Sequence, residues 1–208
     1  MIKILDSKKN NFNFLLDNLL SKRKNKIKFN RSIVVNIIKD IKKNGDKALK
    51  KYEKKFSKNS TIFLNSKEIK KQIRTLDKKV KKSIDLSYKR IFEFHLKQKV
   101  KNIYYKDKLQ NKLSYKYIPL DSVGIYVPGG TASYPSTVLM NAIPAIIAGV
   151  KRIVMVNPRN KGKQNSGVLY AAKKCGIKEI YSIGGAQAVA TLAYGTKKII
   201  KVSKIVGP

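Results

Sequence analysis

Hydrophobic and polar positions divide the chain into a first half with helical spacing and a second half in which strands and helices alternate. In the first half, apolar residues recur every three or four positions in Arg31–Lys43, and again from Lys67 to about Lys97 behind a candidate N-cap at Ser66. This spacing is typical of amphipathic helices that bury one face. Five apolar residues near the start share a helical face in the same way: Phe12, Leu15, Leu16, Leu19 and Leu20.

Two further features of the first half depart from this helical pattern. The Asn44-Gly45 pair predicts the end of one helix, and the helix that follows is expected to bury Leu49, Tyr52 and Phe56. In Val100–Leu120, polar and apolar residues alternate in two runs separated by LQNK. That pattern predicts a β-hairpin.

From Asp121 onward, short β-prone runs alternate with helical segments. Strands are predicted at Val123–Val127, Arg152–Val156, Glu179–Ile183 and Lys201–Val206, and helices at Ser136–Ala148, Ser166–Lys174 and Ala186–Tyr194. This order predicts parallel strands with helices on the faces of the sheet. The predicted fold class is therefore α/β. A mainly helical region with a β-hairpin (residues 1–120) is followed by a Rossmann-like parallel sheet (residues 121–208).

The composition is strongly basic. The 208 residues include 47 Lys and Arg against 12 Asp and Glu, which gives a net charge of +35. A basic surface can bind the phosphates of nucleic acids. However, only six of the basic residues are arginine, the residue whose planar fork suits base and phosphate recognition. Because lysine occurs here with abundant asparagine and isoleucine, we interpret the charge as compositional drift, and nucleic-acid binding is the less favoured alternative.

The single cysteine and the single histidine offer little chemistry. Because Cys175 is the single cysteine, no intrachain disulfide can form, which fits a reducing compartment. Its side chain is expected to be packed as an apolar group. His95 has no second ligand three or four positions away, so it is expected to be structural rather than a metal ligand. No apolar run is long enough to predict a membrane span.

Glycine pairs mark the candidate ligand-binding edge of the predicted sheet. In open α/β sheets, ligands bind beyond the carboxyl ends of the strands. Gly129-Gly130 and Gly184-Gly185 follow two of these ends and precede helices, whose free N–H groups could bind the pyrophosphate of a dinucleotide. The standard GxGxxG fingerprint is absent, so glycines that only serve tight strand–helix turns are an equal alternative.

Four strings in this half also resemble one enzyme family in order and spacing. The segments similar to histidinol dehydrogenase are VGIYVPGG, YPSTVLMNAIPAIIAGV, IGGAQAVATLAYGT and the terminal KIVGP. A weaker similarity to the same family is found in NGDKALKKYEKKF and FHLKQ, in the first half of the chain. The resemblance implies a zinc enzyme of histidine biosynthesis. Such an enzyme oxidises L-histidinol to L-histidine through the aldehyde with NAD, and the resemblance implies a cytoplasmic homodimer.

The same resemblance identifies two side chains as candidate contacts of the cofactor. Tyr126 in GIYVPGG and Gln187 in GGAQA match residues that contact NAD in the family. The family's zinc ligands, its catalytic Glu-His pair and its substrate contacts belong to a later half. The chain is therefore expected to be the N-terminal half of such an enzyme, with no catalytic or metal-binding residues and no activity alone. A non-catalytic remnant is the other alternative.

Overall fold

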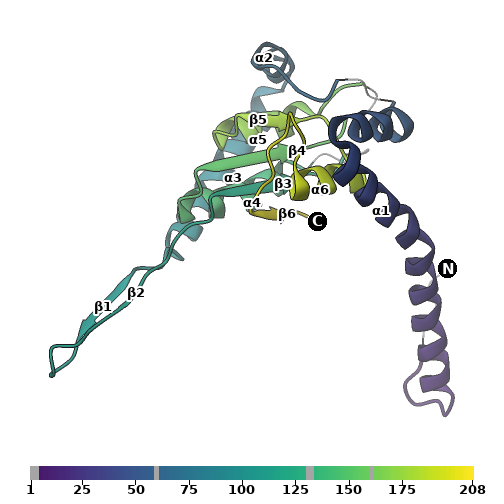
Figure 1. Cartoon of the computed structure of the whole chain (residues 1–208), viewed down its shortest axis with the longest axis horizontal. Helices are drawn as coiled ribbons and strands as arrows, with labels where there is room; N and C mark the ends of the chain where they lie inside the picture. The colour runs from purple at the N-terminus through teal and green to yellow at the C-terminus, as the bar shows by residue number, and fades with distance from the viewer. Residues whose placement is uncertain (1–4, 59–60, 130–133, 160–161) are drawn as a thin grey trace.

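The computed structural model describes residues 5–58, 61–129, 134–159 and 162–208. Its centre is a four-stranded parallel sheet between two layers of helices (Figure 1). The strands are β3 (Ser122–Tyr126), β4 (Arg152–Val156), β5 (Glu179–Tyr181) and β6 (Lys204–Val206), in the order β5-β4-β3-β6. The chain thus moves outward from β3 through β4 to β5 and returns to the opposite side of β3, as in half of a Rossmann fold. The predicted α/β class is confirmed.

Helices from both halves of the chain cover the sheet. The end of α1 (Phe12–Ser57) and α6 (Gly185–Tyr194) pack against one face. The other face is covered by α4 (Pro135–Ala148), α5 (Ser166–Lys174) and α3 (Lys78–Leu96). Each layer closes over its own apolar core, because parallel strands are buried on both faces. The division of the chain near residue 120 stays a prediction.

Helix α1 is bent at Gly45, where the backbone takes φ 48° and ψ −123°. The predicted interruption is therefore confirmed, and the part after the bend buries Leu49 and Tyr52. The expected burial of Phe56 is wrong: its side chain is 51% exposed, because its ring stacks on the Tyr52 ring at 5.9 Å instead of entering the core. The first part of α1 extends away from the body (Figure 1), and Phe14, Leu15, Leu19 and Leu20 are exposed there. Closer to the bend, Ile37 and Ile41 are buried in the core.

The single helix predicted from Lys67 to Lys97 is wrong, since two helices occupy this region. α2 (Ser66–Arg74) ends before Asp77, whose side chain accepts hydrogen bonds from the N–H groups that open α3. An aspartate in this role starts a new helix. The cap of α2 is Asn65, not Ser66 as predicted, and its side chain accepts from the Glu68 N–H group at 2.8 Å.

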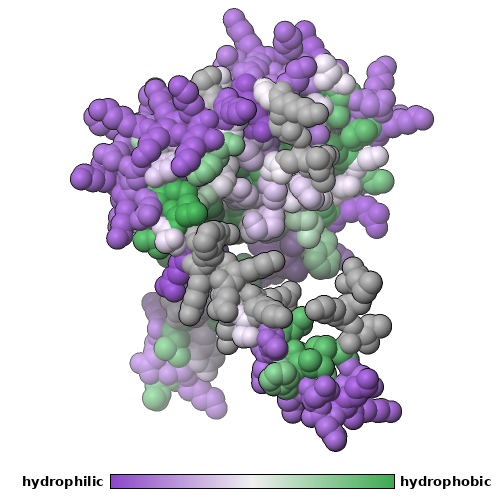
Figure 2. Space-filling model, turned by 90° about the vertical axis from the view of Figure 1, so that its right-hand side faces the viewer, coloured by the Kyte–Doolittle hydropathy of each residue, from purple (hydrophilic) through white to green (hydrophobic). Residues whose placement is uncertain are grey.

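The predicted hairpin is confirmed. β1 (Ile103–Lys106) and β2 (Lys112–Tyr115) pair antiparallel. They project from the body on the side away from α1 (Figure 1), and every residue of both strands is exposed. Hydrophilic side chains cover much of the face seen in Figure 2, with hydrophobic side chains gathered in separate patches.

Two strands are shorter than predicted, because neighbouring segments take their hydrogen bonds. β5 ends at Tyr181, and the following Ser182 N–H group donates to the carbonyl of Ile62, in a segment that covers the edge of the sheet. β6 begins only at Lys204, because the Val202 N–H group donates to the Leu192 carbonyl at the end of α6.

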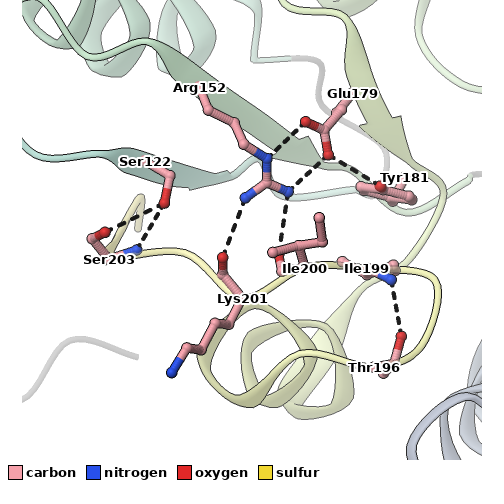
Figure 3. Close-up of polar contacts among 9 residues, drawn as sticks. All are labelled: Ser122, Arg152, Glu179, Tyr181, Thr196, Ile199, Ile200, Lys201 and Ser203. Atoms are coloured by element: carbon pink, nitrogen blue, oxygen red, sulfur yellow. Dashed lines mark hydrogen bonds and ion pairs between the residues drawn. The ribbon is translucent and has the colours of Figure 1, made fainter.

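Polar contacts close the amino edge of the sheet (Figure 3). The Arg152 guanidinium donates to both carboxylate oxygens of Glu179 at 2.8 Å and to the carbonyls of Ile200 and Lys201 at 3.2 Å. This bidentate pair ties the starts of β4 and β5 to the loop before β6. Ligands of open α/β sheets bind at the opposite, carboxyl edge.

Candidate functional site

The candidate site lies at the carboxyl edge, where β3 ends at Tyr126. β4 and β6 both pair with β3, from opposite sides, so the direction of the crossovers changes at β3. Ligands of doubly wound sheets bind at such a switch point. Gly207 follows β6 directly beside this strand end, and a Cβ atom there would overlap the Tyr126 carbonyl oxygen. The close approach requires glycine.

Both residues predicted from the sequence to contact a cofactor meet at one turn. The Gly185 N–H group, at the start of α6, donates to the Tyr126 hydroxyl at 3.0 Å. Gln187 stands in the first turn of the same helix. Tyr126 is half-buried and Gly185 is exposed, whereas Gln187 is only 2% exposed, so part of this turn reaches the surface. Tyr126 and Gln187 are 61 positions apart in the chain.

A third residue of this turn, Glu53, was not predicted. Its side chain is fully buried, and its Oε1 atom accepts from Gln187 Nε2 at 2.9 Å and from the Gly184 N–H group at 3.1 Å. The signal that could have identified Glu53 is its position four residues after Leu49, on the buried face of α1.

The glycines of the two strand–helix turns are explained by packing. A Cβ atom on Gly129 would lie 2.5 Å from Pro158, and one on Gly184 would lie 2.7 Å from the same proline. Both turns thus close on Pro158, the second residue after β4. Gly130, which the sequence marked as part of a possible pyrophosphate cradle, lies outside the described residues.

Further polar side chains connect the strand ends next to this turn. Asn157 is buried, and its Nδ2 atom donates to the carbonyls of Val127 and Pro128 at 3.1 and 3.3 Å. The Arg159 side chain donates to Ser182 at 2.9 Å and to Glu68 at 3.0 Å. These contacts connect the segments of the carboxyl edge to one another, and such supporting hydrogen bonds favour a preorganised binding site.

Comparison with known proteins decides the family. The family model described as histidinol dehydrogenase matches residues 20–208. The chain belongs to the histidinol dehydrogenase family. A histidinol dehydrogenase of Pelagibacter ubique is 69% identical over all 208 residues, and that of Bacillus subtilis is 46% identical over 181 residues, or 86% of the chain.

The structure agrees with a solved histidinol dehydrogenase. The crystal structure of the enzyme from Elizabethkingia anophelis superposes with a TM-score of 0.82 at 37% identity, over 86% of this chain and 42% of that one. The chain spans about half the length of the curated relatives that it matches, covering 49% of the Pelagibacter protein and 42% of the Bacillus protein.

Zinc, which resemblance to histidinol dehydrogenase implies, has no suitable ligands in the part of the chain that the structure describes. The His, Cys, Asp and Glu residues of the described part form no group of three or more that could hold a metal ion. His95 instead lies at the end of α3, with Nδ1 2.6 Å from Gln98 Oε1. Cys175 is buried, and this burial raises the pKa of its thiol to about 12.

Among the same described residues, no helix is both long and apolar enough to cross a membrane.

Proposed function

We propose that this chain forms the NAD-binding part of a histidinol dehydrogenase. The proposed reaction is the oxidation of L-histidinol to L-histidine, with zinc held by residues outside those described here. The observation that carries the cofactor proposal is the convergence of Tyr126 and Gln187 on one turn at the carboxyl edge. A cytoplasmic location and a homodimer belong to the same proposal, by resemblance to the family.

The residues of the turn fit an uncharged part of a dinucleotide. The half-buried Tyr126 offers a ring face for stacking and a hydroxyl group. Gln187 offers a carboxamide that can donate and accept. NAD, when bound, supplies the hydride acceptor. The role of this chain's residues is to bind and orient it at the strand end.

Calorimetric titration of the purified chain with NAD tests this function. Tyr126→Ala and Gln187→Ala are each expected to weaken NAD binding about tenfold, the loss that corresponds to about 1.4 kcal/mol, because each removes one direct contact. Tyr115→Ala, on the exposed hairpin, is the matched control and should bind NAD like the unaltered chain. Equal affinity in all four proteins would contradict the assignment of Tyr126 and Gln187.

A further inference from the structure

The Glu53 carboxyl group occupies an unusual position for a residue of a lysine-rich helix. It is fully buried beneath the start of α6, 131 positions before Gly184. Oε1 accepts the two hydrogen bonds from Gln187 and Gly184, whereas Oε2 has no hydrogen-bond partner among the described residues. Burial of a carboxyl group with incomplete hydrogen bonding costs free energy, so packing alone does not account for a glutamate here.

The contact with Glu53 determines which end of the Gln187 carboxamide faces the exposed Gly185. Only the nitrogen of a carboxamide donates and only its oxygen accepts. Because Glu53 Oε1 is an acceptor, Nε2 of Gln187 faces inward. The carbonyl Oε1 atom then lies beside the exposed Gly185, 3.0 Å from where a Cβ atom of residue 185 would stand.

Two of the N–H groups at the start of α6 are already engaged. The Gly184 N–H group donates to Glu53, and the Gly185 N–H group donates to Tyr126. A phosphate oxygen can only accept hydrogen bonds, and it would approach a carbonyl oxygen and a buried carboxyl group. A hydroxyl or amide group, in contrast, can donate to Gln187 Oε1.

We propose that Glu53 is a positioning residue that fixes Gln187 with its carbonyl toward Gly185. Gln187 Oε1 is thereby held as an acceptor for a hydrogen-bond donor of the ligand, such as a ribose hydroxyl or a carboxamide. The selection of a donor from NAD rests on the proposed function. The orientation of Gln187 by Glu53 does not depend on it.

The first test is the side-chain amide signal of Gln187 in nitrogen-15 NMR spectra, assigned by its loss in Gln187→Ala. Glu53→Ala is expected to shift this signal and to speed its exchange with solvent, because the acceptor is removed. Glu53→Gln keeps an acceptor oxygen and should restore slow exchange. If Glu53→Ala does not fold, Glu53→Asp takes its place. The aspartate side chain is too short to reach Gln187, so this variant should also shift the Gln187 amide signal and speed its exchange. Glu93→Ala, at an exposed site on α3, is the control.

The second test is a double-mutant cycle on NAD affinity. Glu53→Ala should weaken binding about tenfold in the unaltered chain and less than about twofold in the Gln187→Ala background, because both changes remove one coupled interaction. Equal losses in both backgrounds, or an unchanged Gln187 amide signal in Glu53→Ala, would overturn the positioning role. Absence of NAD binding in the unaltered chain would instead contradict the proposed function, and the amide signal would still decide the role of Glu53.

Discussion

At the scale of single residues, Gly185 links the backbone of the candidate site to its side chains. Its φ of 62° lies in the left-handed region, which costs other residues about 1–2 kcal/mol. Its missing Cβ leaves the space into which Gln187 Oε1 extends. One glycine therefore allows both the turn that reaches the Tyr126 hydroxyl and the position of the Gln187 carbonyl beside it.

Gly185→Ala is expected to weaken NAD binding severalfold, because the added methyl group displaces the Gln187 carboxamide, and to destabilise the fold by about 1 kcal/mol through backbone strain. NAD titration and thermal unfolding measure the two effects. Gly176→Ala is the matched control, since Gly176 also has a positive φ, of 70°, but has nothing within 4 Å of its Cβ position. Equal NAD affinity in both variants would show that Gln187 does not depend on Gly185.

The sequence allowed the positions of Tyr126 and Gln187 within their elements to be predicted, because strand ends and helix starts are local patterns. It did not reveal Glu53, since its hydrogen bonds connect residues more than 130 positions apart. Such a contact follows from tertiary packing and has no signature in charge or spacing, beyond the placement of Glu53 on the apolar face of α1.

At the scale of elements, the amino edge of the sheet is held by the ion pair between Arg152 and Glu179 (Figure 3). The hydrogen-bonded Arg152 guanidinium lowers the pKa of Glu179 below its ordinary value. A carboxyl group whose pKa is lower in the folded state stabilises the fold above its unfolded pKa. That contribution is lost as the pH falls through the folded value.

Stability should therefore fall on acidification below about pH 4.5, the ordinary pKa of a glutamate, and Glu179→Gln should make this dependence shallower. Urea unfolding between pH 6 and pH 3 measures the effect, with roughly constant stability at the upper end of this range. Glu93→Gln, which alters an exposed glutamate with a long 3.9 Å ion pair, should leave the dependence unchanged. A Glu179→Gln curve parallel to that of the unaltered chain would contradict the role given to this pair.

Most elements were predictable from hydrophobic periodicity, and the errors occurred where local capping or stacking competed with it. Apolar spacing continues across residues 75–77, but the Asp77 side chain satisfies the N–H groups of a new helix and interrupts the old one. Phe56 has helical spacing with Tyr52, yet it stacks on that ring at the surface. Periodicity alone does not distinguish these outcomes.

At the scale of the whole molecule, two arms extend from the three-layered body: the first part of α1 and the β1–β2 hairpin (Figure 1). Both expose large apolar side chains, such as Phe14 and Tyr104, at 70% and 74%. Exposed apolar surface of this kind is typical of protein–protein contacts, which supports the proposed homodimer. The strand order and the choice of covering helices were not predictable, because they depend on long-range packing.

The most direct test of the central proposal is to map NAD onto the chain by amide chemical shifts in nitrogen-15 NMR spectra. Binding to the carboxyl edge predicts that the signals of Tyr126, Gly185 and Gln187 move in a saturable way, while those of the hairpin and of Arg152 at the amino edge stay in place. Saturable shifts confined to the hairpin or the amino edge, or none at any NAD concentration, would contradict the account.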